Sequence, residues 1–123
     1  MAKILVIDDS DAAIRVVRRA LEEAGHQVVS SGSPFAFSQI MTAEKPDLAL
    51  VDVNLPAITG DKLIQIARTC DASHSCPLVL YSARAPEQAE RLVRSCGASG
   101  FIDKAADPAT LVSRVQGFLQ SAS

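Results

Sequence analysis

The chain has 123 residues, 48% of them hydrophobic and 21% charged, and this size and composition are typical of one globular domain, expected over residues 1–123. The net charge of -2 provides no basic surface for nucleic acid, so we expect no direct nucleic-acid partner. The first apolar run is short and is followed at once by Asp8 and Asp9, which excludes a signal peptide or membrane span there. We therefore expect a cytoplasmic protein with no membrane partner.

Apolar runs typical of strands alternate with amphipathic stretches typical of helices. Strands are predicted over 3–8, 27–31, 47–52, 77–82 and 100–103, and helices over 11–24, 34–44, 60–71, 86–97 and 108–121. Apolar stripes that would pack on a sheet occur in the first helix (Ala13, Val17, Ala20, Leu21, Ala24) and in the last (Leu111, Val112, Val115, Phe118, Leu119).

Capping residues and strand composition indicate how these elements are arranged. Ser33 and Asp107 each precede a proline, as N-caps do, and Gly25 and Gly97 follow helices as C-caps. The runs at 48–52 and 78–82 are apolar on both faces, as in central strands, whereas 27–31 alternates weakly, as at an edge. The sequence therefore predicts an α/β fold, a parallel sheet with helices on both sides.

Four of the predicted strands end in polar residues: Asp8 and Asp9, Asp52, Ser82 and Lys104. The carboxyl ends of parallel strands meet at one edge of a sheet, where ligands bind in open α/β folds. We therefore expect these five side chains to share one site.

The chemistry of this set points to phosphoryl transfer. Clustered carboxylates repel one another unless a cation compensates them, and Mg²⁺ prefers carboxylate ligands together with a phosphate oxygen. Lys104 supplies a cation and Ser82 a hydroxyl, which suit the oxygens of a transferring phosphoryl group. Asp52 is then a candidate nucleophile, since aspartate forms acyl phosphates.

Each residue also has an ordinary structural interpretation. Asp8 and Asp9 can cap a helix, Asp52 can begin a turn, Ser82 can be a plain strand end, and Lys104 can be a solvated charge. Their joint placement at one edge favours a site. The three cysteines, Cys70, Cys76 and Cys96, lack a paired metal spacing and are expected to be reduced thiols.

Four motifs make the chain resemble the receiver domain of two-component response regulators, and single-domain chemotaxis regulators in particular. They are IDDS at 7–10, VDVNLPAITG at 51–60, YSA at 81–83 and GFIDK at 100–104. The resemblance implies a flavodoxin-like, doubly wound sheet of five parallel strands in the order 2-1-3-4-5, with five helices.

The resemblance also implies roles for particular residues. Asp52 would be the phosphoacceptor, taking a phosphoryl group from a histidine kinase or a histidine phosphotransfer protein. Asp8, Asp9 and Asp52, with the backbone carbonyl of Asn54, would hold Mg²⁺, for which Mn²⁺ could substitute. Lys104 would pair with a phosphoryl oxygen.

A switch follows from the same resemblance. Ser82 would donate its hydroxyl to the phosphoryl group and draw its loop inward, and Phe101 would swing into the vacated space, which reshapes a surface for a downstream protein effector. The alternative for Phe101 is plain core packing.

One position departs from the common receiver pattern, because Lys104 is followed by Ala105 where most receivers have a proline after a cis peptide bond. A cis bond before a residue other than proline costs about 2.5 to 4 kcal/mol, so we expect a trans bond and a differently shaped loop. Asn54 and Arg84 would flank the approach of hydrolytic water.

On the first helix, Ala12 and Val16 lie beside the buried stripe and form a candidate docking patch for a helical phosphodonor. Ordinary surface apolar residues are the alternative.

The leading functional prediction is a phosphoacceptor regulator and not an enzyme. An unphosphorylated interaction module on the same fold is one alternative. An aspartyl-phosphate phosphatase is another, but such enzymes usually need a second carboxylate two residues after the nucleophile, where this chain has Asn54.

Overall fold

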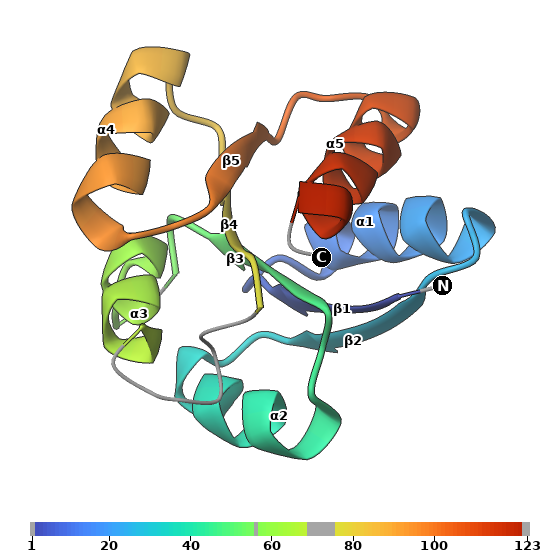
Figure 1. Ribbon diagram of the computed structural model, residues 1–123, viewed down its shortest axis with the longest axis horizontal. Coiled ribbons are helices and arrows are strands. Elements are labelled where there is room, and N and C mark those ends of the chain that lie inside the picture. The colour runs from blue at the N-terminus through green and yellow to red at the C-terminus, as the bar shows by residue number, and fades with distance from the viewer. Residues whose placement is uncertain (1, 56, 69–75, 122–123) are drawn as a thin grey trace.

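The computed structural model describes residues 2–55, 57–68 and 76–121, and these form a sheet of five parallel strands in the order β2-β1-β3-β4-β5, flanked by helices (Figure 1). The elements are β1 (Lys3–Ile7), α1 (Asp11–Glu23), β2 (Gln27–Ser31), the 3₁₀ helix η1 (Pro34–Ala36), α2 (Phe37–Glu44), β3 (Leu48–Asp52), α3 (Gly60–Ala67), β4 (Leu78–Ser82), α4 (Pro86–Cys96), β5 (Gly100–Asp103) and α5 (Pro108–Ser121). The predicted fold class and strand order are confirmed.

Helices cover both faces of the sheet, and each face has its own apolar core. On one face α1 and α5 pack against side chains such as Ile4, Leu50 and Val79. On the other face α2, α3 and α4 cover side chains such as Leu5 and Leu80 (Figure 1). Every residue of β3 and β4 is buried, as predicted for central strands, and β2 lies at an edge.

Most predicted boundaries lie within one residue of those in the structure, but two helices and one residue of an apolar stripe differ from the prediction. The helix predicted over 34–44 is divided, because the Ser33 hydroxyl accepts a hydrogen bond from the Phe35 N–H and a tight 3₁₀ turn precedes α2. Helix α3 ends at Ala67, short of the predicted 60–71, of which 69–71 lie outside the described residues. Ala24 is exposed and not part of the buried stripe, because it is the C-cap of α1.

The predicted caps Asp107 and Gly97 are present, whereas Gly25 lies one residue beyond the C-cap of α1, with a φ of 94°. Asp107 Oδ1 accepts a hydrogen bond from the Thr110 N–H at 2.8 Å, and Gly97 closes α4 with a φ of 79°. None of the helices in the described part of the chain has the length and apolar content needed to cross a bilayer.

Two glycines, Gly97 at the end of a helix and Gly117 inside one, allow a matched test of how glycine affects helix stability. Gly97 has the left-handed backbone that a Cβ disfavours, so Gly97→Ala should lower the free energy of unfolding by about 1 kcal/mol. Gly117 lies within α5, and a Cβ there would meet no atom within 4 Å. Gly117→Ala should therefore raise the free energy of unfolding by about 0.5 to 1 kcal/mol, since glycine weakens a helix interior. Urea denaturation measures both, and changes of the same sign in the two variants would contradict this account.

Candidate functional site

The polar residues that follow β1, β3, β4 and β5 converge at the carboxyl edge of the sheet. Asp8, Asp52 and Ser82 are almost completely buried, with exposed fractions of 1%, 2% and 1%, whereas Asp9 is exposed. One carboxylate oxygen from each of Asp8, Asp9 and Asp52 lies within 4.8 Å of the others. The structure thus brings together the three carboxylates that the sequence singled out.

The side chain of Lys104 reaches into this cluster. Its Nζ lies 3.0 Å from Asp52 Oδ1 and 3.2 Å from Asp8 Oδ2. The Lys104–Ala105 bond is trans, as expected. Backbone hydrogen bonds place the lysine, since its N–H donates to the Ser82 carbonyl at 2.9 Å and the next N–H, that of Ala105, donates to Asp103 Oδ1 at 2.8 Å. The loop therefore aims Lys104 at the carboxylates without a proline.

The negative charge of the Asp8 carboxylate is destabilised by its surroundings. Its burial raises its pKa above the ordinary value of 3.8, and the neighbouring Asp52 adds to this, while the Ser10 N–H and Lys104 act in the opposite direction. Oδ1 accepts a hydrogen bond from the Ser10 N–H at 2.9 Å. Among the described residues, Oδ2 has no hydrogen-bond partner of favourable geometry, although the Lys104 ion pair is close. The ion pair with Lys104 is the compensation that this buried oxygen has, and a divalent cation would add to it.

Lys104 is held in its charged form. Partial burial by itself would lower its pKa, but hydrogen bonds and charge attraction from Asp52 and Asp8 outweigh that effect, and the pKa is raised above 10.5. The ammonium is therefore present across the physiological pH range.

The donor set fits a hard divalent cation. Three carboxylates that converge, one with an unsatisfied buried oxygen and one open to solvent, are the oxygen ligands that Mg²⁺ prefers. Asn54, two residues beyond Asp52, is exposed, and its N–H donates to Asp52 Oδ1 at 3.2 Å. Its carbonyl stays a predicted ligand.

The backbone of Asp52 is in close contact with the start of α3. The Gly60 N–H donates to the Val53 carbonyl at 2.9 Å, and a Cβ added at Gly60 would overlap the carbonyl oxygen of Asp52. Only glycine permits this approach. The sequence motif contained Gly60, but nothing in the pattern identified its contact with Asp52.

The two candidate switch residues come from neighbouring strands. Ser82 Oγ accepts a hydrogen bond from the Arg84 N–H at 3.0 Å, so its hydroxyl is part of the loop that follows β4. Phe101 is partly buried against the core that α2, α3 and α4 cover, and its carbonyl accepts a hydrogen bond from Arg114 at 2.7 Å. Their roles in switching stay predictions.

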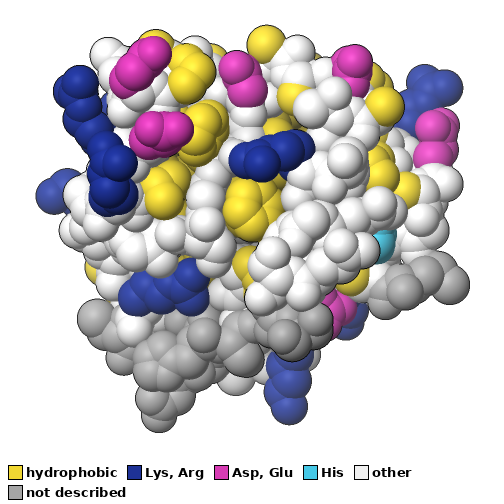
Figure 2. Space-filling view, turned by 45° about the horizontal axis from the view of Figure 1, so that its top comes forward, with side chains coloured by type: hydrophobic (Ala, Val, Ile, Leu, Met, Phe, Trp, Pro, Cys, Tyr) yellow, Lys and Arg dark blue, Asp and Glu magenta, His cyan; other side chains and the backbone are white. Residues whose placement is uncertain are grey.

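Phe101 also lines an open hollow of about 340 Å³ between α4 and α5, together with Val93 and Phe118. Figure 2 shows the side of the molecule that carries these helices, where hydrophobic side chains lie between separate basic and acidic ones. The rotameric state of Phe101 therefore affects the shape of a solvent-facing surface.

The candidate docking residues Ala12 and Val16 are both exposed, and 55% of Val16 is accessible to solvent. Arg84, predicted to flank the water route, is exposed as well.

Two further features lie outside the site. Cys76 and Cys96 are free and buried, and burial raises the pKa of Cys76 to about 11, so its thiol is protonated and unreactive; Cys70 lies outside the described residues.

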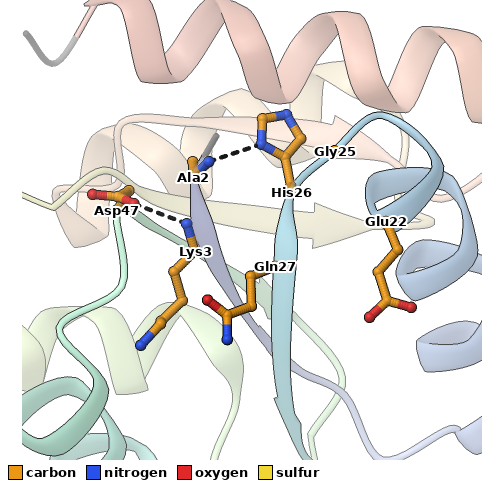
Figure 3. Close-up of a pocket in the computed structure, with 7 residues that line it drawn as sticks. All are labelled: Ala2, Lys3, Glu22, Gly25, His26, Gln27 and Asp47. Carbon is orange, nitrogen blue, oxygen red and sulfur yellow. Dashed lines mark hydrogen bonds between the residues drawn. The ribbon is translucent and has the colours of Figure 1, made fainter.

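A second hollow opens at the opposite end of the sheet, where His26 accepts from the Ala2 N–H and Asp47 from the Lys3 N–H (Figure 3). His26 Nδ1 and Asp47 Oδ2 are thus each paired with a backbone N–H of β1 or of the residue before it, while His26 Nε2 has no hydrogen-bond partner among the described residues.

Tyr81 is a site neighbour that the sequence did not single out. Its ring is 5% exposed, and Lys104 Nζ lies 5.4 Å from the ring centroid. The motif YSA at 81–83 contained Tyr81, but its register with Asp52 is known only from the structure.

Comparison with known proteins defines the class. The family of the response regulator receiver domain matches residues 4–116, and the chain therefore belongs to this family. The resemblance found in the sequence motifs is confirmed.

Protein PilH of Pseudomonas aeruginosa is 27% identical over 120 residues, which cover 97% of this chain and 98% of PilH. Transcriptional regulatory protein YxdJ of Bacillus subtilis is 31% identical over 104 residues, or 85% of this chain and 44% of YxdJ. CseB of Streptomyces coelicolor is 29% identical over 117 residues, or 95% of this chain and 49% of CseB. The chain thus spans about half the length of these two transcriptional regulators.

Solved structures agree. The chemotaxis response regulator CheY4 of Vibrio cholerae superposes with a TM-score of 0.88 at 26% identity, covering 96% of this chain and 98% of CheY4. A response regulator from Chloroflexus aurantiacus gives a TM-score of 0.88 at 28% identity, covering 97% of this chain and 98% of that chain.

The raised pKa of Asp8 predicts a stability change with a definite sign. The folded protein binds a proton at Asp8 more tightly than the unfolded chain does, so the contribution of Asp8 to the free energy of unfolding falls as pH rises above about 4. The amide side chain introduced by Asp8→Asn carries no charge at any pH. In EDTA at pH 7 the variant should be more stable than the parent by about 1 kcal/mol, a size typical of single substitutions.

Thermal unfolding followed by circular dichroism from pH 7 down to about pH 3 measures this effect. The advantage of Asp8→Asn should shrink as Asp8 in the parent becomes protonated. Lys104→Met is the opposite control, because it removes the compensating cation and should destabilise the protein at pH 7. If Asp8→Asn were less stable than the parent at pH 7, the charged Asp8 carboxylate would not be destabilising the folded protein, which would contradict this account.

Proposed function

We propose that this protein is a phosphoacceptor receiver of a two-component or phosphorelay system, with Asp52 as the acceptor. The observation that carries the proposal is the buried carboxylate of Asp52, held 3.0 Å from the ammonium of Lys104 beside two further carboxylates. Receiver domains take phosphoryl groups from histidine kinases and signal to effectors, and the family match supports the same role here.

The proposed reaction is an in-line displacement at phosphorus. An oxygen of Asp52 forms a bond to the phosphorus of a phosphohistidine, the P–N bond breaks, and the imidazole nitrogen leaves with the electron pair and then takes a proton from solvent. Asp8, Asp9 and Asp52, with the carbonyl of Asn54, would hold Mg²⁺ or Mn²⁺, which would neutralise charge on the phosphoryl oxygens. Lys104 pairs with one of these oxygens.

The new charge at Asp52 is the signal in this proposal. Phosphorylation adds about -1.5 to -2 units of charge and three acceptor oxygens, to which Ser82 then donates its hydroxyl in place of its present loop contact. Phe101 follows Ser82 inward and alters the surface between α4 and α5, where a downstream protein binds. Asn54 lacks the carboxylate of an efficient phosphatase, so the protein acts as a regulator and not as an enzyme.

The proposed partners are a histidine kinase or histidine phosphotransfer protein and a protein effector, with no direct contact to nucleic acid or membrane. Such donors present their phosphohistidine in the cytoplasm, where we place this protein.

Acetyl phosphate with Mg²⁺ tests the acceptor directly. Intact-mass spectrometry should show one added phosphoryl group on the parent protein and none on Asp52→Asn. Asp61→Asn, which removes a carboxylate on α3, is the matched control and should be modified like the parent. EDTA should abolish the adduct.

The other outcomes are informative. An adduct on Asp52→Asn would refute the assignment of the acceptor. No adduct on the parent, together with failure to bind beryllofluoride, would favour an unphosphorylated interaction module.

The docking patch on α1 makes a separate prediction. Val16→Glu should slow transfer from a histidine phosphotransfer protein that phosphorylates the parent by about 10-fold, because it places charge in an apolar contact. Phosphorylation by acetyl phosphate should not change. Ile66→Glu is the matched control, since Ile66 on α3 is 54% exposed. Equal slowing of both phosphodonors, or of both variants, would rule out docking at Val16.

A further inference from the structure

Tyr81 lies where its ring can act on the site. It is the second-last residue of β4 and pairs in register with Asp52 of β3. Residues in register on neighbouring parallel strands point to the same face of the sheet, so the ring of Tyr81 and the carboxylate of Asp52 share a face. Tyr81 is packed in the core that α1 and α5 cover.

The ammonium of Lys104 lies between this ring and the carboxylates. Nζ is 5.4 Å from the ring centroid of Tyr81, 3.0 Å from Asp52 Oδ1 and 3.2 Å from Asp8 Oδ2. A cation within about 6 Å of a ring face is attracted by the ring quadrupole, more strongly where water is excluded. The lysine head therefore has an aromatic contact in addition to its two ion pairs.

The backbone of Lys104 alone does not fix the position of its ammonium group. Its backbone is anchored through Ser82 and Asp103, but four rotatable bonds separate that backbone from Nζ, and 26% of the side chain is exposed to solvent. The residue after Lys104 is alanine, which adds no constraint of its own. The buried ring of Tyr81 has a fixed position, and the flexible side chain of Lys104 packs against it.

We propose that Tyr81 is a positioning residue for Lys104: its ring face holds the ammonium where it meets Asp52 and the phosphoryl group that Asp52 receives. The inference rests on the proposed function of Asp52. The ring face, and not the hydroxyl, carries the effect. Phenylalanine should therefore replace Tyr81, whereas an aliphatic residue of similar burial should not.

Two measurements test the role. The first is the rate of phosphorylation by acetyl phosphate with Mg²⁺, which should fall about 10-fold in Tyr81→Leu and stay within about twofold of the parent in Tyr81→Phe. Phe35→Leu is the control, because it removes a ring that is 77% exposed and has no part in the site, and it should leave the rate unchanged. Tyr81→Met replaces the leucine variant if that protein fails to fold.

The second measurement needs no phosphoryl group. The ε-methylene protons of Lys104, assigned from their loss in Lys104→Arg, should be shifted upfield by the ring current in the parent and in Tyr81→Phe. In Tyr81→Leu they should return to the position of a solvated lysine. Because Tyr81→Leu also removes the ring current itself, displacement of Lys104 in that variant is read from the NOE between its ε-methylene protons and the Asp52 β-protons, which should weaken.

The inference is overturned if Tyr81→Leu matches the parent in either measurement, or if Tyr81→Phe behaves like Tyr81→Leu. Failure of the proposed function is distinguishable, because then the parent itself forms no adduct. In that case the Lys104 resonance in the parent, together with the NOE to Asp52 in Tyr81→Leu, decides whether the ring positions the lysine.

Discussion

Asp8 and Asp52 are buried together at the end of the sheet, and the ammonium of Lys104 lies within 3.2 Å of both carboxylates. Burying two like charges is costly unless an opposite charge and hydrogen bonds compensate them. The rest of the site depends on this arrangement, because β1, β3 and β5 must end at one level for the three groups to meet. The order of the strands therefore determines the chemistry that this edge can support.

Much of this architecture follows from local patterns in the sequence. The all-apolar runs that end in Asp52 and Ser82 predict central parallel strands, and the shared edge of a parallel sheet then brings their polar ends together. The prolines after Ser33 and Asp107 and the glycine at 97 mark helix ends by backbone chemistry alone. These features depend only on neighbouring residues, which explains why they could be predicted without a structure.

Contacts between distant segments could not be predicted in the same way. Tyr81 has the composition of a core residue, and its position near Lys104 arises from strand register and from the path of the loop after β5. That loop is set by the bond from the Ala105 N–H to Asp103, a contact that no motif contains. The exposed Ala24 and the short 3₁₀ turn before α2 were missed because periodicity gives no information on the hydrogen bond that ends or divides a helix.

The approach of Gly60 to the carbonyl of Asp52 means that Asp52 is held at two places, its side chain by Lys104 and its backbone by α3. Loss of the Lys104 contact would let the Asp52 side chain change rotamer. One methyl group at position 60, by contrast, would displace the backbone at the end of β3. The position of Asp52 is therefore more sensitive to added atoms than to lost ones. The requirement for glycine at position 60 therefore comes from the packing of α3 on the end of β3, and it holds whether or not Asp52 reacts.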